Sequence, residues 1–126
     1  MTDVSPVIGR YIAIWNETDT ARRRDLIAET WTEDASYVDP LMRGDGPDGI
    51  DAMVAGVQQQ FPGHWFQRTG EIDAHNDRVR FAWALVGNSG GSPVVAGVDF
   101  GVIAADGRLQ AITGFLDQAP ALPDGA

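Results

Sequence analysis

The stretch RVRFAWALV, residues 78–86, decides the fold of this chain, because large apolar side chains alternate along it with charged or small ones. Successive side chains of a β-strand point to opposite faces, so the alternation predicts a strand with one buried face, formed by Val79, Phe81, Trp83 and Leu85. Three more segments are patterned in this way and predict strands over residues 64–73, 93–104 and 108–118. Turn residues lie between consecutive strands, which is typical of an antiparallel meander.

The first half of the chain has a different period. Apolar residues recur there every three or four positions, which predicts amphipathic helices over residues 4–16, 20–31 and 47–61. A short extended run at residues 36–40 precedes the third helix and stops at Pro40, which has no N–H for a continuing ladder. Helices followed by a meander predict an α+β fold, with the three helices packed on one face of a strongly curved antiparallel sheet.

Length and composition indicate one globular domain. A chain of 126 residues is long enough for one core, and we expect a single domain over residues 1–126, with a core at 8–118 and a flexible tail at 119–126. No stretch approaches the roughly 18 consecutive apolar residues of a membrane span. The N-terminal MTDVSPVIGR lacks the basic lead and apolar run of a secretory or transit peptide, which favours a cytoplasmic location.

The charged and metal-binding residues exclude several classes of function. The chain has no cysteine and 2 histidines, so we expect no disulfide and no metal, and we treat His64 and His75 as surface residues. The net charge of −9 would repel nucleic acid, so we do not expect a nucleic-acid partner. Arg22, Arg23 and Arg24 lie in the first turns of the second helix, where we expect solvated side chains.

Three polar residues fall where the pattern predicts an apolar core face. Tyr11 lies on the apolar face of the first helix, Asp39 at the end of the extended run, and Asp99 within the strand at 93–104. Removing a proton next to a carbonyl requires a carboxylate on one side and donors at the oxygen where negative charge develops. A buried, unpaired Asp99 would take up a proton and become such a donor, and small neighbours on its face, among them Gly97, leave room for a ligand.

Each of these residues also has a purely structural explanation. Asp99 could pair with Arg78 or Arg80 on the neighbouring strand. Asp39 could cap the turn before the proline, which is a frequent use of aspartate. Tyr11 could be a core residue whose hydroxyl bonds a backbone carbonyl.

Four strings carry a resemblance to a known family: RYIA at 10–13, WTEDASYVDP at 31–40, GI at 49–50 and VVAGVDF at 94–100. In this order they resemble the cone-shaped fold of the nuclear transport factor 2 superfamily, whose members include SnoaL-like cyclases and ketosteroid isomerases. The resemblance covers residues 8–118 and looks most like ketosteroid isomerase. In that enzyme an aspartate followed by proline moves the proton, while a tyrosine and a protonated aspartate hydrogen-bond the enolate oxygen. The resemblance thus implies that Asp39 is the base and that Tyr11 and Asp99 are the donors.

The expected activity follows from the resemblance. It implies a cofactor-independent isomerase or lyase (cyclase) that acts on a small hydrophobic carbonyl compound, polyketide-like or steroid-like, through an enolate. Eight residues are expected to line the substrate pocket: Trp15, Trp31, Tyr37, Val54, Phe66, Trp83, Gly97 and Phe115. Val54 falls where some of these enzymes carry a supporting tyrosine, so the donor network is expected to be thinner here.

Two further expectations concern partners. The alternative to an enzyme is a non-catalytic small-molecule-binding or dimerisation domain, because the same cone hosts both kinds of protein. The outward-facing positions of the expected strand at 78–86, including Ala82, Ala84 and Val86, are apolar, and members of the superfamily commonly pair sheet to sheet. We therefore expect a homodimer formed through the sheet face.

Overall fold

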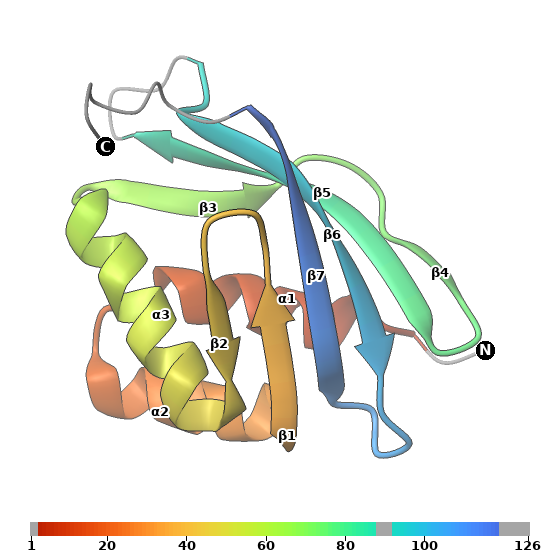
Figure 1. Cartoon of the computed structure of the whole chain (residues 1–126). Coiled ribbons are helices and arrows are strands. Elements are labelled where there is room, and N and C mark those ends of the chain that lie inside the picture. Colours follow the sequence, from red (N-terminus) through yellow and green to blue (C-terminus); the bar gives the residue numbers. More distant parts are fainter. Residues whose placement is uncertain (1–2, 88–91, 119–126) are drawn as a thin grey trace.

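Residues 3–87 and 92–118, which the computed structural model describes, form three helices and one seven-stranded sheet (Figure 1). The helices are α1 (Ser5–Asn16), α2 (Thr20–Thr30) and α3 (Gly46–Gln60). Asp19 caps α2 by accepting a hydrogen bond from the backbone N–H of Arg22, and prolines stand in the first turns of α1 and α3. The α+β prediction with helices on one face of a curved sheet is confirmed.

The strands are β1 (Trp31–Val38), β2 (Arg43–Asp45), β3 (His64–Arg68), β4 (Asp73–His75), β5 (Arg78–Gly87), β6 (Val95–Ile103) and β7 (Leu109–Gln118). Their order in the sheet is β2-β1-β7-β6-β5-β3, and β4 pairs with the other end of β5. The expectation of a wholly antiparallel sheet is wrong at one pair, since β1 runs parallel to β7. The chain enters β1 directly from α2, so the direction of β1 is set by this helix and not by a hairpin with β7.

Two boundaries also differ from the sequence prediction. The expected strand at 64–73 is two strands, because β3 pairs with the second half of β5 and β4 with the first half. The extended run expected at 36–40 begins at Trp31 and continues through a turn into β2, which pairs with its end. The predicted tail at 119–126 and part of the predicted turn at 87–92 lie outside the described residues.

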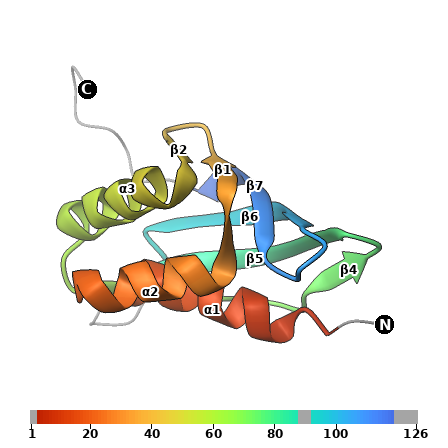
Figure 2. The same cartoon turned by 90° about the horizontal axis from the view of Figure 1, so that it is seen from below.

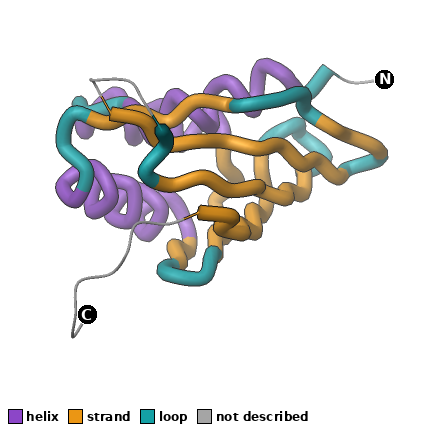
Figure 3. Tube along the Cα trace, turned by 90° about the horizontal axis from the view of Figure 1, so that it is seen from above, coloured by secondary structure: helices purple, strands orange, loops and turns teal. Residues whose placement is uncertain are grey.

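The helices connect the two ends of the curled sheet. α3 packs against β1 and β2, whereas α1 packs against β3 at the opposite end of the strand order, and α2 contacts both of the other helices. Figure 2 shows α1 and α2 side by side on the same side of the sheet. In the trace seen from above, the strands lie in front of α1, and α3 lies beside them (Figure 3). No helix in residues 3–87 and 92–118 is long and apolar enough to cross a membrane.

A buried ion pair holds the helices together. Arg23 is 3% exposed, donates to Asp51 of α3 at 2.6 Å and also reaches the carbonyl of Glu17 and the side chain of Gln58. The expectation of solvated side chains is therefore wrong for Arg23, because α3 covers the face of α2 on which this residue lies. The network fixes α3 against the ends of α1 and α2.

Candidate functional site

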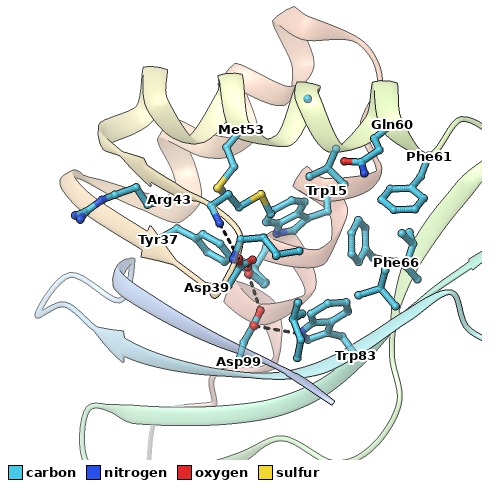
Figure 4. A pocket seen from close by; sticks show the side chains of 18 of the residues that line it. Trp15, Tyr37, Asp39, Arg43, Met53, Gln60, Phe61, Phe66, Trp83 and Asp99 are labelled. Atoms are coloured by element: carbon cyan, nitrogen blue, oxygen red, sulfur yellow. Dashed lines mark hydrogen bonds between the residues drawn. The ribbon is translucent and has the colours of Figure 1, made fainter. Parts of the chain in front are cut away.

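A cavity of about 650 Å³ lies between α1, α3 and the inner face of the sheet (Figure 4). Its walls are mostly aromatic and aliphatic, including Trp15, Met42, Met53, Phe61, Phe66 and Trp83. Two carboxyl groups, those of Asp39 and Asp99, reach into it from neighbouring parts of the sheet. A mostly apolar cavity of this size with few polar groups is the usual form of a small-molecule site.

Asp99 faces the cavity because it alternates inward along β6, and it is 2% exposed. The Tyr11 hydroxyl donates to Asp99 Oδ2 at 2.6 Å, and the Trp83 indole Nε1 donates to Oδ1 at 3.0 Å. Arg78 and Arg80 instead pair with Asp77 and Asp73, on the outer face of β5. The alternative pairing of Asp99 with an arginine is thus contradicted.

The buried position changes the acidity of Asp99. The pKa of Asp99 is raised to about 6. Burial is the largest cause, the hydrogen bonds from Tyr11 and Trp83 act in the opposite direction, and the charge of Asp39 raises the pKa as well. The raised pKa is in the direction that a protonated Asp99 requires, and the two donors, Tyr11 and Trp83, oppose it by stabilising the carboxylate.

Asp39 follows the last residue of β1 and is half-buried. Its Oδ1 accepts the backbone N–H groups of Leu41 and Met42 at 2.8 and 3.0 Å, and its Oδ2 accepts the Tyr37 hydroxyl at 2.7 Å. The turn-capping explanation for Asp39 is therefore correct, and the same side chain also lines the cavity. The backbone contacts leave Oδ2 as the oxygen with fewer donors.

Gly114 of β7 lies where the two carboxyl groups meet. A Cβ at this position would be 2.9 Å from Asp99 Oδ1, 3.1 Å from Asp39 Cβ and 3.2 Å from the Tyr37 hydroxyl. Since these distances are measured from one point, Asp99 Oδ1 and Asp39 Cβ are separated by no more than the sum of the first two. A side chain at position 114 would displace at least one of these groups. No local sequence pattern distinguishes this glycine, because its role depends on β1 lying beside β7.

Two tyrosines, one for each carboxyl group, are buried in the site. Burial and the charge of Asp99 raise the pKa of Tyr11 and of Tyr37 far above the usual range of a phenol. Both hydroxyls therefore stay protonated and act as donors. Tyr37 was expected only as a wall residue, and its bond to Asp39 is an additional polar contact of the site.

The other predicted pocket residues divide into two groups. Trp15, Tyr37, Phe66 and Trp83 line the cavity. The remaining predictions, for Trp31, Val54, Gly97 and Phe115, need correction because these residues lie outside the cavity lining.

Trp31 and Val54 are each 1% exposed and belong to the packed core behind the cavity wall. At Gly97 a Cβ would be 2.9 Å from the Trp83 ring, so that ring fills the space expected for a ligand. Phe115 is 52% exposed and contacts Phe100, because Gly114 points inward and the next residue of β7 must point outward.

Neither histidine lies in the cavity lining. His64 is next to the carbonyl of Pro62, and His75 is next to Asn76 at a turn. Within residues 3–87 and 92–118 no group of three or more His, Cys, Asp or Glu residues has the arrangement of a metal site. Taken by themselves, the groups in the cavity suit proton transfer, since carboxylates accept protons and phenols donate hydrogen bonds.

Comparison with known proteins identifies relatives of this chain. The family model of the SnoaL-like domain matches residues 8–112. A protein from Agrobacterium tumefaciens, described as a proposed isomerase of the SnoaL-like family, is 41% identical, with 93% of this chain and 99% of that chain covered and a TM-score of 0.87. None of the curated proteins compared with the chain matches it.

Two more distant solved structures share the fold. A proposed polyketide cyclase from Sinorhizobium meliloti is 19% identical, with a TM-score of 0.67 and coverage of 86% of this chain and 93% of its own. A nuclear transport factor 2-like protein of unknown function from Exiguobacterium is 20% identical, with a TM-score of 0.70 and coverage of 88% and 98%. With the family match over most of its length, this chain belongs to the SnoaL-like domain family, and it has the fold of the nuclear transport factor 2-like protein.

Proposed function

We propose that the protein is a cofactor-independent enzyme that moves a proton on a small hydrophobic carbonyl compound, polyketide-like or steroid-like, through an enolate. The observation that carries the proposal is the pair of carboxyl groups beside Gly114, each hydrogen-bonded to a buried tyrosine and both open to an apolar cavity. The description of the 41% identical relative as a proposed isomerase supports this class of reaction.

Asp39 is the base in this proposal. Its Oδ2 takes a proton from the carbon next to the carbonyl, the C–H electron pair forms the C=C bond of the enolate, and the negative charge moves to the carbonyl oxygen. Asp39 suits this role better than Asp99 because it is less buried, and two backbone N–H groups fix its other oxygen.

Tyr11 and Asp99 stabilise the enolate oxygen. In the empty cavity Tyr11 donates to the Asp99 carboxylate. A bound hydrophobic compound displaces water, and the charge that develops on its oxygen repels a carboxylate, so both effects raise the pKa of Asp99 further above about 6. Asp99 then takes a proton from solvent, and both groups donate to the enolate. Each such donor contributes about 3–4 kcal/mol to transition-state stabilisation.

Two outcomes of the enolate are compatible with the same residues. In an isomerase, protonated Asp39 returns the proton to a different carbon of the conjugated system. In a cyclase, the enolate carbon attacks a second carbonyl of the same molecule, and the new alkoxide takes the proton from Asp39. In both cases Asp39 ends as the carboxylate that began the reaction, so no cofactor is consumed.

The test uses hydrogen exchange, because it requires only the first step. The protein is incubated in D2O with a panel of hydrophobic ketones, and NMR follows the replacement of protons next to the carbonyl. We expect wild-type protein to catalyse exchange of at least one compound and Asp39→Asn to lose it by about 100-fold or more while still binding that compound. Asp25→Asn, on the exposed face of α2, is the matched control and should keep full activity. Equal exchange by Asp39→Asn and wild type would exclude Asp39 as the base.

A non-catalytic binding domain is the second candidate, and one observation favours it. Asp39 caps its own turn through two backbone hydrogen bonds, a structural role that needs no chemistry. This candidate predicts that ketones bind but that neither wild type nor Asp39→Asn increases their exchange. The same experiment therefore separates the two candidates.

A further inference from the structure

Gly56 lies on the cavity side of α3, and neither the backbone nor the packing of the helix explains why this residue is a glycine. It is an interior position of the helix Gly46–Gln60, four residues before its end. Glycine there is less favourable than alanine, because it loses more backbone freedom on folding. A glycine at such a position normally serves a conformational or packing purpose.

Neither purpose applies at Gly56. Its φ is not positive, in contrast to Gly46 at the start of the same helix. A Cβ added to Gly56 would meet nothing within 4 Å, so no neighbouring element needs the missing side chain in order to approach. Gly44 shows the difference, since a Cβ there would lie 2.9 Å from the Gly49 carbonyl oxygen.

The space next to Gly56 is part of the cavity. Gly56 is exposed and lines this cavity, and Ala52, one turn earlier, lines the same wall with another small side chain. Met53 and Val57 beside them are larger and partly buried, so the helix presents a shallow depression between apolar side chains. This depression belongs to the α3 wall of the cavity. Asp39 and Asp99 lie on the side of the sheet (Figure 4).

We propose that Gly56 determines substrate size: it makes room for the far end of a broad, multi-ring hydrophobic carbonyl compound whose carbonyl lies at Asp39 and Asp99. This inference rests on the proposed function and adds to it the residue that selects substrates by their breadth. A single-ring compound held at the carboxyl groups leaves the depression empty, whereas a fused-ring compound fills it against the α3 backbone. Affinity for broad compounds therefore depends on the absence of a side chain at position 56, and affinity for narrow compounds does not.

The experiment compares two phenols of different breadth, because a phenol carries its hydroxyl on an sp² carbon as the enol of the reaction does. The probes are phenol itself and oestradiol, a four-ring phenol. Binding is followed by the NMR signal of the Trp83 indole N–H, which is hydrogen-bonded to Asp99 at the site. The variants are Gly56→Leu and Gly56→Ala.

The matched control is Gly9→Leu. Gly9 is also an interior helix glycine with nothing within 4 Å of an added Cβ, but it lies on the exposed side of α1 and away from the cavity lining. We expect Gly56→Leu to weaken oestradiol binding by about tenfold to 100-fold, the range expected for overfilling a packed apolar contact, and Gly56→Ala to weaken it less. Phenol binding should change by less than about twofold, and Gly9→Leu should change neither affinity.

Three results would overturn the inference. Unchanged oestradiol affinity in Gly56→Leu removes the size role while leaving the proposed function intact. An equal loss for phenol and oestradiol means that the position blocks the whole cavity and does not select for breadth. If wild type binds neither phenol, the proposed function fails and the inference fails with it. Circular dichroism of each variant verifies that the helices are intact, which is expected because leucine and alanine favour helices more than glycine does.

Discussion

Replacing Tyr11 by phenylalanine should make Asp99 a much weaker acid. The substitution removes the 2.6 Å hydrogen bond to Asp99 Oδ2 and keeps the ring that packs against Trp15, Trp31 and Phe81. The hydrogen bond from Tyr11 is the largest effect that lowers the pKa of Asp99 against the raising effect of burial. Without it the carboxylate keeps one side-chain donor, Trp83 Nε1.

The size of the effect follows from the energy of this contact. A hydrogen bond to a charged group contributes about 1.5–3 kcal/mol, and about 1.4 kcal/mol corresponds to a tenfold change in an equilibrium constant. Asp99 in Tyr11→Phe should therefore be about ten- to 100-fold weaker as an acid than in wild type, where its pKa is raised to about 6. The variant would then carry a largely protonated Asp99 at neutral pH even with an empty cavity.

The assay is an NMR titration of the Asp99 side-chain carboxyl carbon in both proteins. Tyr37→Phe is the matched control, since it removes a buried phenolic hydroxyl that donates to Asp39 and not to Asp99. We expect the midpoint for Asp99 to move to higher pH in Tyr11→Phe and to move much less in Tyr37→Phe. An unchanged or lower midpoint in Tyr11→Phe would refute the reasoning, because it would mean that the hydroxyl does not stabilise the carboxylate.

Three other predictions concern stability and assembly. Because burial raises the pKa of Asp99 from 3.8 to about 6, the contribution of Asp99 to stability is complete below pH 3.8 and is lost as the pH rises through 6. The free energy of unfolding in urea should therefore fall by about 3 kcal/mol over this range in wild type, relative to Asp99→Asn. A difference between the two proteins that stays constant with pH would contradict this assignment. Arg23→Ala should lower the free energy of unfolding by about 3–5 kcal/mol because it leaves Asp51 buried without its main partner, whereas Arg22→Ala, on the exposed side of α2, should change it by less than about 0.5 kcal/mol. We propose that a second copy of the chain covers the exposed aromatic pair Phe100 and Phe115 on the outer sheet face. Light scattering should then give a molar mass of twice 13.5 kDa for wild type and a lower mass for Phe115→Asp. A wild-type mass near 13.5 kDa would exclude the dimer.

Local patterns were sufficient to predict the three helices and the inward face of β5, but they did not predict β2 or the separate strand β4. They also placed Ala84 and Val86 on an outward apolar face, whereas both residues are buried. The alternation at residues 78–86 predicted a strand that buries Val79, Phe81, Trp83 and Leu85, and all four are buried in β5. The parallel pairing of β1 with β7 could not be predicted in this way, because it joins segments more than 70 residues apart whose sequences contain no shared turn. Arg22, Arg23 and Arg24 are chemically identical, so the burial of the middle one depends on where α3 packs.

The candidate site was predictable in its residue types but not in its contacts. Tyr11 and Asp99 were both expected on inward faces, and they are hydrogen-bonded to each other. The roles of Tyr37 and Gly114 depend on which strand lies next to β1, and no local pattern contains that information. Phe115 was expected in the pocket because it is large and apolar, but the glycine that precedes it takes the inward position of β7.

The parallel pairing of β1 with β7 has a consequence for how the protein folds. Asp39 arrives with the first third of the chain and Asp99 with the last, and they meet only when β1 docks beside Gly114. A partly folded molecule in which the β5–β6–β7 meander has formed but β1 has not docked possesses no site. A ligand therefore recognises only the completed fold, and its binding energy adds to global stability: at a concentration 100 times its Kd, it contributes about 2.7 kcal/mol. For this protein, a shift in melting temperature is thus a direct readout of occupancy, and screening by thermal stability is a route to the natural substrate.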